Sequence, residues 1–366
     1  MTFLIFIIIL LVLILVHEFG HFYVAKKFGI RVDEFGFGFP PRIARLWKKN
    51  GTEYTINAIP FGGFVKIFGE NPTDIPMNET DRKQSFLGKP RLVQAAVLFA
   101  GVFFNLIFAW FILTVGFLSG MPTSSSSGDT TAFSTLPQVT IVSVHPDSPA
   151  SRAGLMPGDK VISLETSDTA LSKDLDPKVI TEFVSHHDGD KISLVYERKG
   201  EETAVTVTPE KIAGSDAHII GISMDTIGIV RLPIHKAIWE GFHTTVVGFW
   251  GTLTGFIHLI GGAFSGSVSA GAVAGPVGIA GLAGDAYQFG FGYMLFFVAI
   301  LSINLAVINL IPFPALDGGR LLFLLIEKIK GSPIKPQISN IVNGIGFLIL
   351  IGFMLVVTYH DIVRLF

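Results

Sequence analysis

The sequence predicts a polytopic α-helical membrane protein with four transmembrane helices and one inserted polar domain. Three observations lead to this prediction. Only 15% of the 366 residues are charged and 49% are hydrophobic, whereas roughly a quarter are charged in soluble domains. The uncharged residues are gathered in long stretches, and one polar, charge-rich region lies between the second and third of them. Such a composition excludes a disordered chain, which needs low hydrophobicity and high net charge.

The first predicted span follows from an unbroken apolar run over residues 3–16 that continues, after a short polar cluster, to Ala25. About 20 apolar residues are enough to cross a bilayer. The run begins without Lys or Arg, and Lys26 and Lys27 follow it, so a secretory signal peptide is disfavoured.

The rest of the chain is divided by its uncharged windows and by a Ser-rich linker that precedes the polar region. The predicted order is a first transmembrane helix at 1–28, a β-rich loop at 29–90, a second transmembrane helix at 91–119, a linker at 120–137, a polar domain at 138–210, an amphipathic and Gly-rich connection at 211–285, a third transmembrane helix at 286–330 and a fourth at 331–366.

The distribution of charge predicts the orientation. Residues 26–91 hold 12 Lys and Arg against 7 Asp and Glu, whereas residues 119–240 hold 10 against 17. The excess of positive charge places the first loop on the cytosolic side, so both termini and the polar domain are expected outside. The net charge of −2 gives no reason to expect nucleic acid as a partner.

A cluster of ionisable residues interrupts the first apolar run. His17-Glu18-x-x-His21 places two imidazoles one helical turn apart on one face, where they can bind one zinc ion, with Glu18 beside them as a base for water. His17 lies about 21 Å along the helix from Phe3, inside a ~30 Å hydrocarbon core. Ionisable residues at that depth are usually functional. The alternative is a helix end whose polar residues reach the interface.

The chain has no Cys, so any metal must be bound by His and carboxylate side chains. A catalytic zinc needs three protein ligands, and the candidate for the third is Asp317, the single charge between residues 286 and 319. Pro312 and Pro314 break the helix before it, and Gly318 and Gly319 follow it. The alternative is that Asp317 is an ordinary N-cap for the helix that follows.

The depth of the two motifs decides between four and five spans. His17 lies toward the cytosolic end of its helix, so Asp317 must reach the same side of the bilayer. A fifth crossing over residues 243–260 would place Asp317 on the opposite side. We therefore expect residues 234–262 to lie at the membrane interface, with Trp239 and Trp250 as anchors, and residues 261–284 to form an irregular or re-entrant connection.

These features resemble the site-2 protease family of intramembrane zinc metalloproteases, and the bacterial regulator of sigma-E protease branch in particular. The resemblance covers nearly the whole chain. It rests on the His-Glu-Phe-Gly-His sequence at 17–21 in a first span, the stretch 309–319 in a third, and the inserted polar domain. Many members of that branch have two PDZ domains, whereas only one fits here.

The resemblance implies site residues at matching positions. His17, His21 and Asp317 correspond to the zinc ligands, Glu18 to the general base, and Asn309 to a polar group that contacts substrate or the reacting centre. Residues 101–105 resemble the family's Gly-Pro-x-x-Asn in the second span, with Val102 in place of Pro. Asn105 is therefore either part of that motif or a residue that holds helices together.

The β-rich loop is a candidate for substrate binding. Strands are predicted at 46–49, 53–59 and 64–68, with an Asn50-Gly51 hairpin turn. A protease must hold its substrate extended, which an exposed strand edge can do. The family has a membrane-associated β-loop here. The alternative is a cytosolic β-meander without substrate contact.

The polar domain resembles a PDZ domain. Its strands alternate over 139–144, and the stretch around Gly154 and Leu155 resembles the loop whose backbone amides receive a chain-terminal carboxylate. The domain either binds a peptide C-terminus or excludes substrates with bulky ectodomains. The remaining histidines have no ligand-like spacing and are expected at surface or packing positions; they include His145, His186, His187, His218 and His258.

The resemblance implies an intramembrane zinc endopeptidase of the bacterial plasma (inner) membrane, with its active site near the cytosolic side. Its expected substrates are single-span membrane proteins, such as anti-sigma factors, or remnant signal peptides, and its other partner is the lipid bilayer. The competing hypothesis is a catalytically inactive membrane adaptor that binds partner proteins through the PDZ-like domain.

Overall fold

The computed structural model describes residues 2–70, 78–125, 133–145, 147–173, 175–198, 200–211, 218–265 and 274–363. The chain forms two compact units. The first contains residues 1–115, 238–288 and 294–366, and the second contains residues 116–237 and 289–293. A polar, strand-rich unit is thus inserted into a helical one, as the sequence predicts.

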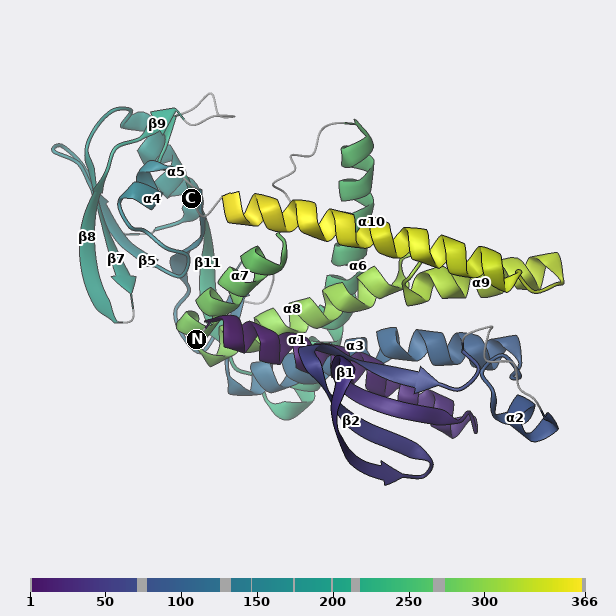
Figure 1. Ribbon diagram of the computed structural model, residues 1–366. Helices are drawn as coiled ribbons and strands as arrows, with labels where there is room; N and C mark the ends of the chain where they lie inside the picture. Colours follow the sequence, from purple (N-terminus) through teal and green to yellow (C-terminus); the bar gives the residue numbers. More distant parts are fainter. Residues whose placement is uncertain are drawn as a thin grey trace. The chain divides into compact units, whose positions relative to one another are not determined.

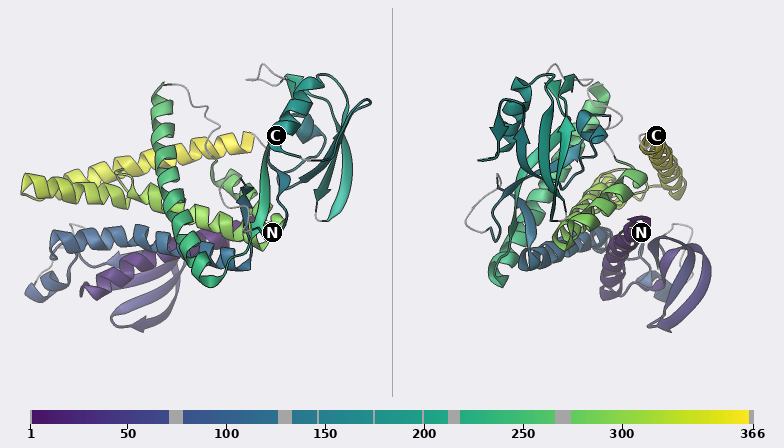
Figure 2. Two further views of the ribbon diagram at one scale, coloured as in Figure 1. Left: turned by 180° about the vertical axis from the view of Figure 1, so that it is seen from behind. Right: turned by 90° about the vertical axis from the view of Figure 1, so that its left-hand side faces the viewer.

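Long helices make up most of the first unit. They are α1 (Thr2–Lys27), α3 (Arg91–Ser119), α6 (Ile234–Ser265), α7 (Pro276–Phe289), α8 (Phe291–Leu310), α9 (Asp317–Lys330) and α10 (Pro336–Val363), with the short α2 (Glu79–Gln84) before α3. Helices α1, α3, α8 and α10 run in a common direction, which α6 crosses (Figures 1 and 2). Large apolar side chains are exposed on these helices, such as Phe3 at 60% and Leu348 at 70%. This surface suits lipid rather than water.

In the part of the chain that the structure describes, five helices are long and apolar enough to cross a membrane: α1, α3, α6, α8 and α10. Four of them fall in the windows predicted as spans. The fifth, α6, has the lowest mean hydropathy of the set and is the least buried. The number of four crossings therefore remains a prediction, since α6 passes the criteria of length and composition.

The structure corrects the prediction for residues 261–284. An irregular or re-entrant connection was expected, but α6 continues to Ser265 and α7 occupies Pro276–Phe289, so the irregular form is wrong for these residues and the re-entrant one stays a prediction. The carboxylate of Asp361 on α10 caps α7, because it accepts hydrogen bonds from the backbone N–H groups of Gly275 at 3.1 Å and Gly278 at 2.8 Å. This cap satisfies amides that a helix start leaves free, and its donor lies 86 residues away from Asp361, so local sequence could not reveal it.

The third predicted span at 286–330 is divided in the structure. Helix α7 ends at Phe289, α8 ends at Leu310, and α9 begins at Asp317. Pro312 and Pro314 lie in the break between α8 and α9, where they cannot supply the N–H groups that a continuous helix needs.

The predicted β-rich loop is an antiparallel pair, β1 (Val32–Lys49) and β2 (Thr52–Ile67). Asn50 and Gly51 form the turn with φ of 50° and 80°, as Asn-Gly hairpin turns require. The first half of β1 pairs on one side with residues 63–67 and on the other with residues 53–56. Residues 63–67 thus pair with one strand only and form an edge of this sheet among the described residues.

The second unit is built on one sheet with the order β3-β11-β4-β5-β7-β8, and β6 on β5. Its strands are β3 (Met121–Ser124), β4 (Gln138–Val144), β5 (Lys160–Glu165), β6 (Ala170–Leu171), β7 (Ile192–Arg198), β8 (Glu201–Val207) and β11 (Ile222–Val230), and a separate small sheet pairs β9 (Glu210–Lys211) with β10 (His218–Ile219). Helices α4 (Pro149–Arg152) and α5 (Pro177–His186) complete the unit. Residues such as Leu164, Ile180 and Leu194 form its apolar core.

This sheet extends beyond the predicted polar domain at 138–210. Strand β3 comes from the segment predicted as a linker, and β11 comes from the segment predicted as a connection. Residues 126–132, which include most of the Ser-rich linker, lie outside the described residues. The extension arises because β11 pairs with β4 on one side and β3 on the other, a tertiary pairing that strand patterns alone do not specify.

Candidate active site

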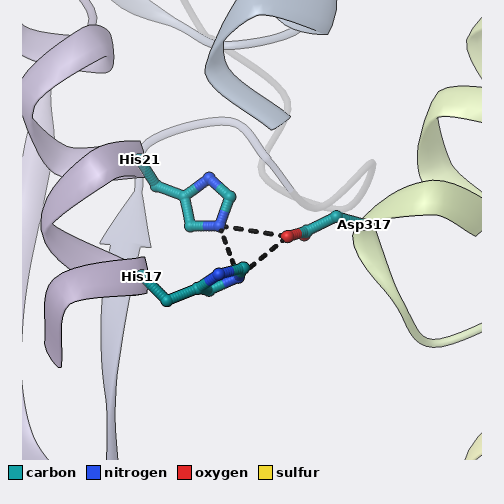
Figure 3. A group of neighbouring side chains, drawn as sticks. All are labelled: His17, His21 and Asp317. Carbon is teal, nitrogen blue, oxygen red and sulfur yellow. Dashed lines mark hydrogen bonds and ion pairs between the residues drawn. The ribbon is translucent and has the colours of Figure 1, made fainter. Parts of the chain in front are cut away.

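Two histidines of α1 face the interior of the first unit. His17 and His21 lie one turn apart, so their side chains point to the same face of the helix, and each is only 7% exposed. Their Nε2 atoms are 3.1 Å apart. The two rings stand nearly perpendicular, with centroids 4.7 Å apart, so both Nε2 atoms face a common point (Figure 3).

Asp317 reaches the same point from the first position of α9, 300 residues along the chain from His17 (Figure 3). Its Oδ2 is 2.9 Å from Nε2 of His17 and 3.2 Å from Nε2 of His21. The interpretation of Asp317 as a simple N-cap is wrong, because Leu316 is the N-cap and its side chain makes no capping hydrogen bond. The Asp317 carboxylate contacts the histidines instead.

The break before α9 positions Asp317. Ala315 adopts a left-handed backbone with φ of 74°, and its N–H donates to Oδ1 of Asn343 on α10. Gly319 allows the chain to fold back closely, because a Cβ there would lie 2.2 Å from the carbonyl oxygen of Phe313. The turn is therefore anchored from α10 and packed too tightly for a larger residue.

The three side chains fit a zinc ion. A four-coordinate zinc with bonds of ~2.0–2.1 Å holds its ligand atoms about 3.3 Å apart, and the three atoms here are 2.9 to 3.2 Å apart. Two imidazoles and one carboxylate are the ligand types of catalytic zinc sites. No other group of three or more such residues converges in this way in the described chain.

Helix α3 supports both imidazoles from behind. The Nδ1 atom of His21 is 2.8 Å from the carbonyl oxygen of Val97, so Nδ1 carries the proton and leaves Nε2 free to bind a metal. Gly101 lies directly against both rings, since a Cβ there would be 2.5 Å from Nε2 of His21 and 2.7 Å from Nε2 of His17. A larger residue at this position would displace the ligands.

A cavity of about 350 Å³ opens beside the cluster. Glu18 and Asn309 line it together with His17, His21 and Asp317, so the structure brings together all five residues that the sequence singled out. The edge residues 63–65 and Ile67 of β2 also line this cavity. The candidate base, the three candidate metal ligands and an edge of the β1–β2 sheet therefore share one space.

Sequence reasoning missed one ion pair in this cavity. Arg320 on α9 donates a hydrogen bond to Glu70, which follows β2, and both side chains line the cavity. The burial of Arg320 opposes its charge, but the neighbouring carboxylate of Glu70 raises its pKa above the ordinary value. The signal that could have found it is the position of Arg320, three residues after Asp317 and so near the same helical face.

The second unit provides no such cluster among its described residues. His218 pairs with Asp188 at 3.0 Å, and His187 contacts the hydroxyl of Thr169 at 3.0 Å. These contacts agree with the prediction that the remaining histidines serve surface or packing roles.

The stretch around Gly154 and Leu155 is not a free carboxylate loop. The N–H of Gly154 donates to the carbonyl of Ser151, and the N–H of Leu155 donates to that of Ala150. The N–H of Met156 donates to Asp159. These amides are therefore already paired within the unit, which corrects the role that the sequence suggested for them.

Comparison with known proteins is consistent with this geometry. A model of peptidase family M50 matches residues 5–353. The chain is 38% identical to a protein of Nostoc sp. named "Putative zinc metalloprotease all3971", over 94% of this chain and 91% of the relative. It is 31% identical to "Putative zinc metalloprotease RC0203" of Rickettsia conorii, over 99% of this chain and 98% of the relative.

A third relative is the regulator of sigma E protease of Salmonella typhi, with 30% identity over 98% of each chain. That alignment extends over 451 positions, whereas this chain has 366 residues. The Salmonella protein therefore contains segments without a counterpart here.

Proposed function

This chain belongs to peptidase family M50 and is a membrane-embedded zinc metalloprotease, and from this premise we propose that it cleaves its substrates within their transmembrane segments. We propose His17, His21 and Asp317 as the zinc ligands and Glu18 as the general base. The observation that carries the proposal is that three candidate ligand atoms, two from α1 and one from α9, lie within 3.2 Å of one another. Helix α1 is itself long and apolar enough to span a bilayer.

The chemistry follows from the residues around the cavity. Zinc, when bound, supplies a Lewis acid that polarises the scissile carbonyl and lowers the pKa of water. Glu18 takes the proton from the attacking water and returns it to the leaving amine, as a general base and then acid. Asn309 offers an amide that orients the substrate backbone in the same cavity.

The substrate is held as an added strand on the edge formed by residues 63–67. A helical substrate hides its carbonyls in internal hydrogen bonds, so cleavage requires an extended segment. On one side, the edge pairs with no described strand, and it lines the cavity that contains Glu18. The Val65 backbone makes a hydrogen bond with Glu18 there, so a bound peptide would lie directly beside the proposed base. Backbone pairing there would present a peptide to the catalytic residues independently of its side chains.

The protein is a multi-pass protein of the bacterial inner membrane. We propose four crossings, with both termini and the second unit extracytoplasmic and the active site near the cytosolic face. The charge difference between residues 26–91 and 119–240 supports this orientation. The direction of α6, which crosses that of the other long helices (Figure 1), supports an interfacial place for it.

The substrates that we propose are single-span membrane proteins, of the anti-sigma factor type, or remnant signal peptides. The second unit acts either as a size filter for ectodomains or as a peptide-binding PDZ-like domain. Residues 222–226 of β11 favour the latter, because they pair with β4 on one side and with no described strand on the other. The alternative of an inactive adaptor is disfavoured, since a base and three ligands converge in the first unit.

One experiment tests the catalytic assignment. The protein is purified in detergent, its zinc content is measured, and cleavage of a transmembrane reporter is compared for wild type and Glu18→Gln. We expect zinc to stay bound and the cleavage rate to fall by about 10²–10⁴-fold, the usual contribution of a general base. Glu79→Gln, at an exposed position of α2, is the matched control. Cleavage by Glu18→Gln at the wild-type rate would refute the proposed base.

A second experiment tests the topology. Reporter fusions at Gly128 and at Gly331 are expected to map outside the cytosol and inside it, respectively. A fifth crossing by α6 would place the Gly331 fusion outside, together with Asp317, and would overturn the four-span arrangement.

A further inference from the structure

One buried amide beside the metal ligands has an unusual environment. Asn105 on α3 is fully buried, and its Nδ2 lies 3.3 Å from Nδ1 of His17. Its Oδ1 is buried and has no hydrogen-bond partner among the residues that the structure describes. Unpaired buried oxygens are rare and require an explanation, because they lose their hydrogen bonds to water without replacement.

The two orientations of this amide correspond to two tautomers of His17. If Nδ2 faces the ring, it donates to Nδ1, and the ring proton must then be on Nε2, which would point it at Asp317. That tautomer has no lone pair for a metal on Nε2. If the amide is rotated by half a turn, Oδ1 faces the ring and accepts the proton of Nδ1, and Nε2 is free to bind a metal.

We propose that Asn105 is a positioning residue for the metal site, which accepts a hydrogen bond through Oδ1 from Nδ1–H of His17 and so selects the metal-binding tautomer. This inference rests on the proposed ligand role of His17. It also gives the orphaned oxygen a partner, which the orientation with Nδ2 toward the ring does not.

The partner histidine shows the same arrangement with a different acceptor. Nδ1 of His21 lies 2.8 Å from the carbonyl oxygen of Val97, which is also on α3. One helix therefore supports both rings: the Val97 carbonyl contacts His21, and the Asn105 side chain and the Gly101 backbone contact His17. Of these groups, only the Asn105 side chain can be removed by substitution.

A role in helix packing alone does not account for these contacts. The backbone carbonyl of Asn105 accepts a hydrogen bond from Ser302 on α8 at 2.8 Å, so the contact between α3 and α8 at this point does not use the side chain. The amide's one hydrogen bond in the described structure is to the ring of His17.

Zinc affinity of the purified full chain in detergent tests the proposal, measured by competition with a chromophoric chelator. Asn105→Leu has a similar volume and no acceptor, and should weaken zinc binding by about 10–100-fold, as loss of an outer hydrogen bond to a ligating histidine does. Asn105→Asp retains an acceptor and should bind zinc at least as tightly as wild type. Ser302→Ala removes the backbone contact only and should leave the affinity unchanged.

The outcomes separate the possibilities. Wild-type zinc affinity in Asn105→Leu would overturn the proposal, as would an equal loss in Asn105→Leu and Asn105→Asp, since the amide donor would then be the important group. Thermal unfolding of the metal-free variants shows whether a loss reflects folding; if Asn105→Leu does not fold, the Asp variant alone decides. Failure of the ligand assignment itself is distinguishable, because His17→Ala would then bind zinc as tightly as wild type.

Discussion

Asp159 in the second unit and Asp317 in the first are both carboxylates withdrawn from water, but their partners differ. Asp159 is 1% exposed, and Arg198 binds both of its oxygens at 2.6 Å. The N–H of Met156 donates to it as well. The hydrogen bonds that Arg198 donates to Asp159 also raise the pKa of the Arg198 guanidinium. This carboxylate is fully satisfied by a permanent cation, so its role is structural.

Among the described residues, Asp317 forms no ion pair with Lys or Arg. Its partners are two imidazoles, and the nearby Arg320 pairs with Glu70 instead. A partly buried carboxylate that faces two imidazole nitrogens is suited to a divalent cation. The difference indicates that a carboxylate paired with Arg stabilises a fold, whereas a carboxylate that contacts histidines instead is a candidate metal ligand.

The strongest test of this difference is to remove the carboxylate of Asp317, which contacts histidines and not Arg. Asp317→Ala should release zinc and abolish cleavage, with a loss of zinc affinity greater than the ~10–100-fold expected for an outer hydrogen-bond partner. Zinc content after dialysis and reporter cleavage measure the two effects. Asp159→Ala serves as the control and should retain zinc; full zinc occupancy in Asp317→Ala would remove it from the ligand set.

Removal of the Asp159 carboxylate, which Arg198 binds, should lower the stability of the second unit and leave zinc binding unchanged. Asp159→Ala removes the carboxylate that binds Arg198 and the N–H of Met156, so the second unit should lose about 1.5–3 kcal/mol of unfolding free energy. Hydrogen exchange of the β5 and β7 amides in the full chain measures this loss. Unchanged exchange would mean that the pair does not hold the unit together.

A larger residue at Gly101, which lies against both imidazoles, should displace His17 and His21 without removing either side chain. Gly101→Ala introduces a Cβ within 2.7 Å of both Nε2 atoms, and we expect a cost of about 1–3 kcal/mol, typical of overpacking, together with weaker zinc binding. Gly255→Ala on α6, where a Cβ meets nothing within 4 Å, is the matched control. Equal zinc affinity in both variants would contradict this expectation.

An exposed ion pair should have the smallest effect. Arg152 contacts Glu210 on the surface of the second unit, and both side chains are about half exposed. Water screens such pairs, so Arg152→Ala should change the stability of the unit by about 0–1 kcal/mol. Hydrogen exchange of the same amides tests it; a loss as large as that of Asp159→Ala would show that burial does not govern the difference.

The candidate site was largely predictable because its parts carry local signals. His17, Glu18 and His21 are close in sequence, and the helical repeat alone places the imidazoles on one face. Asp317 was identifiable as the one charge in an apolar stretch between two prolines and two glycines. The fold was predictable to the same degree, since apolar windows mark most of the helices and the Asn50-Gly51 turn marks the hairpin.

Other features required the structure because they depend on contacts between distant residues. The capping of α7 by Asp361 joins segments 86 residues apart, so residues 276–289 form a helix where their Gly-rich sequence predicts none. The pair of Glu70 with Arg320 spans 250 residues, and the contact of Asn105 with His17 spans 88. No local periodicity specifies which of many charged or amide side chains will meet.

The sequence by itself thus determined that the chain is a membrane protein with an inserted polar domain, and it singled out a His-Glu-x-x-His helix and Asp317 as the candidate site. These conclusions depend on composition and on short-range helical geometry. Only the tertiary structure decided that the three ligand atoms meet within 3.2 Å, that residues 63–67 form a free edge on their cavity, and that α3 supports both imidazoles. Such relations arise from packing, in which the whole chain determines each distance.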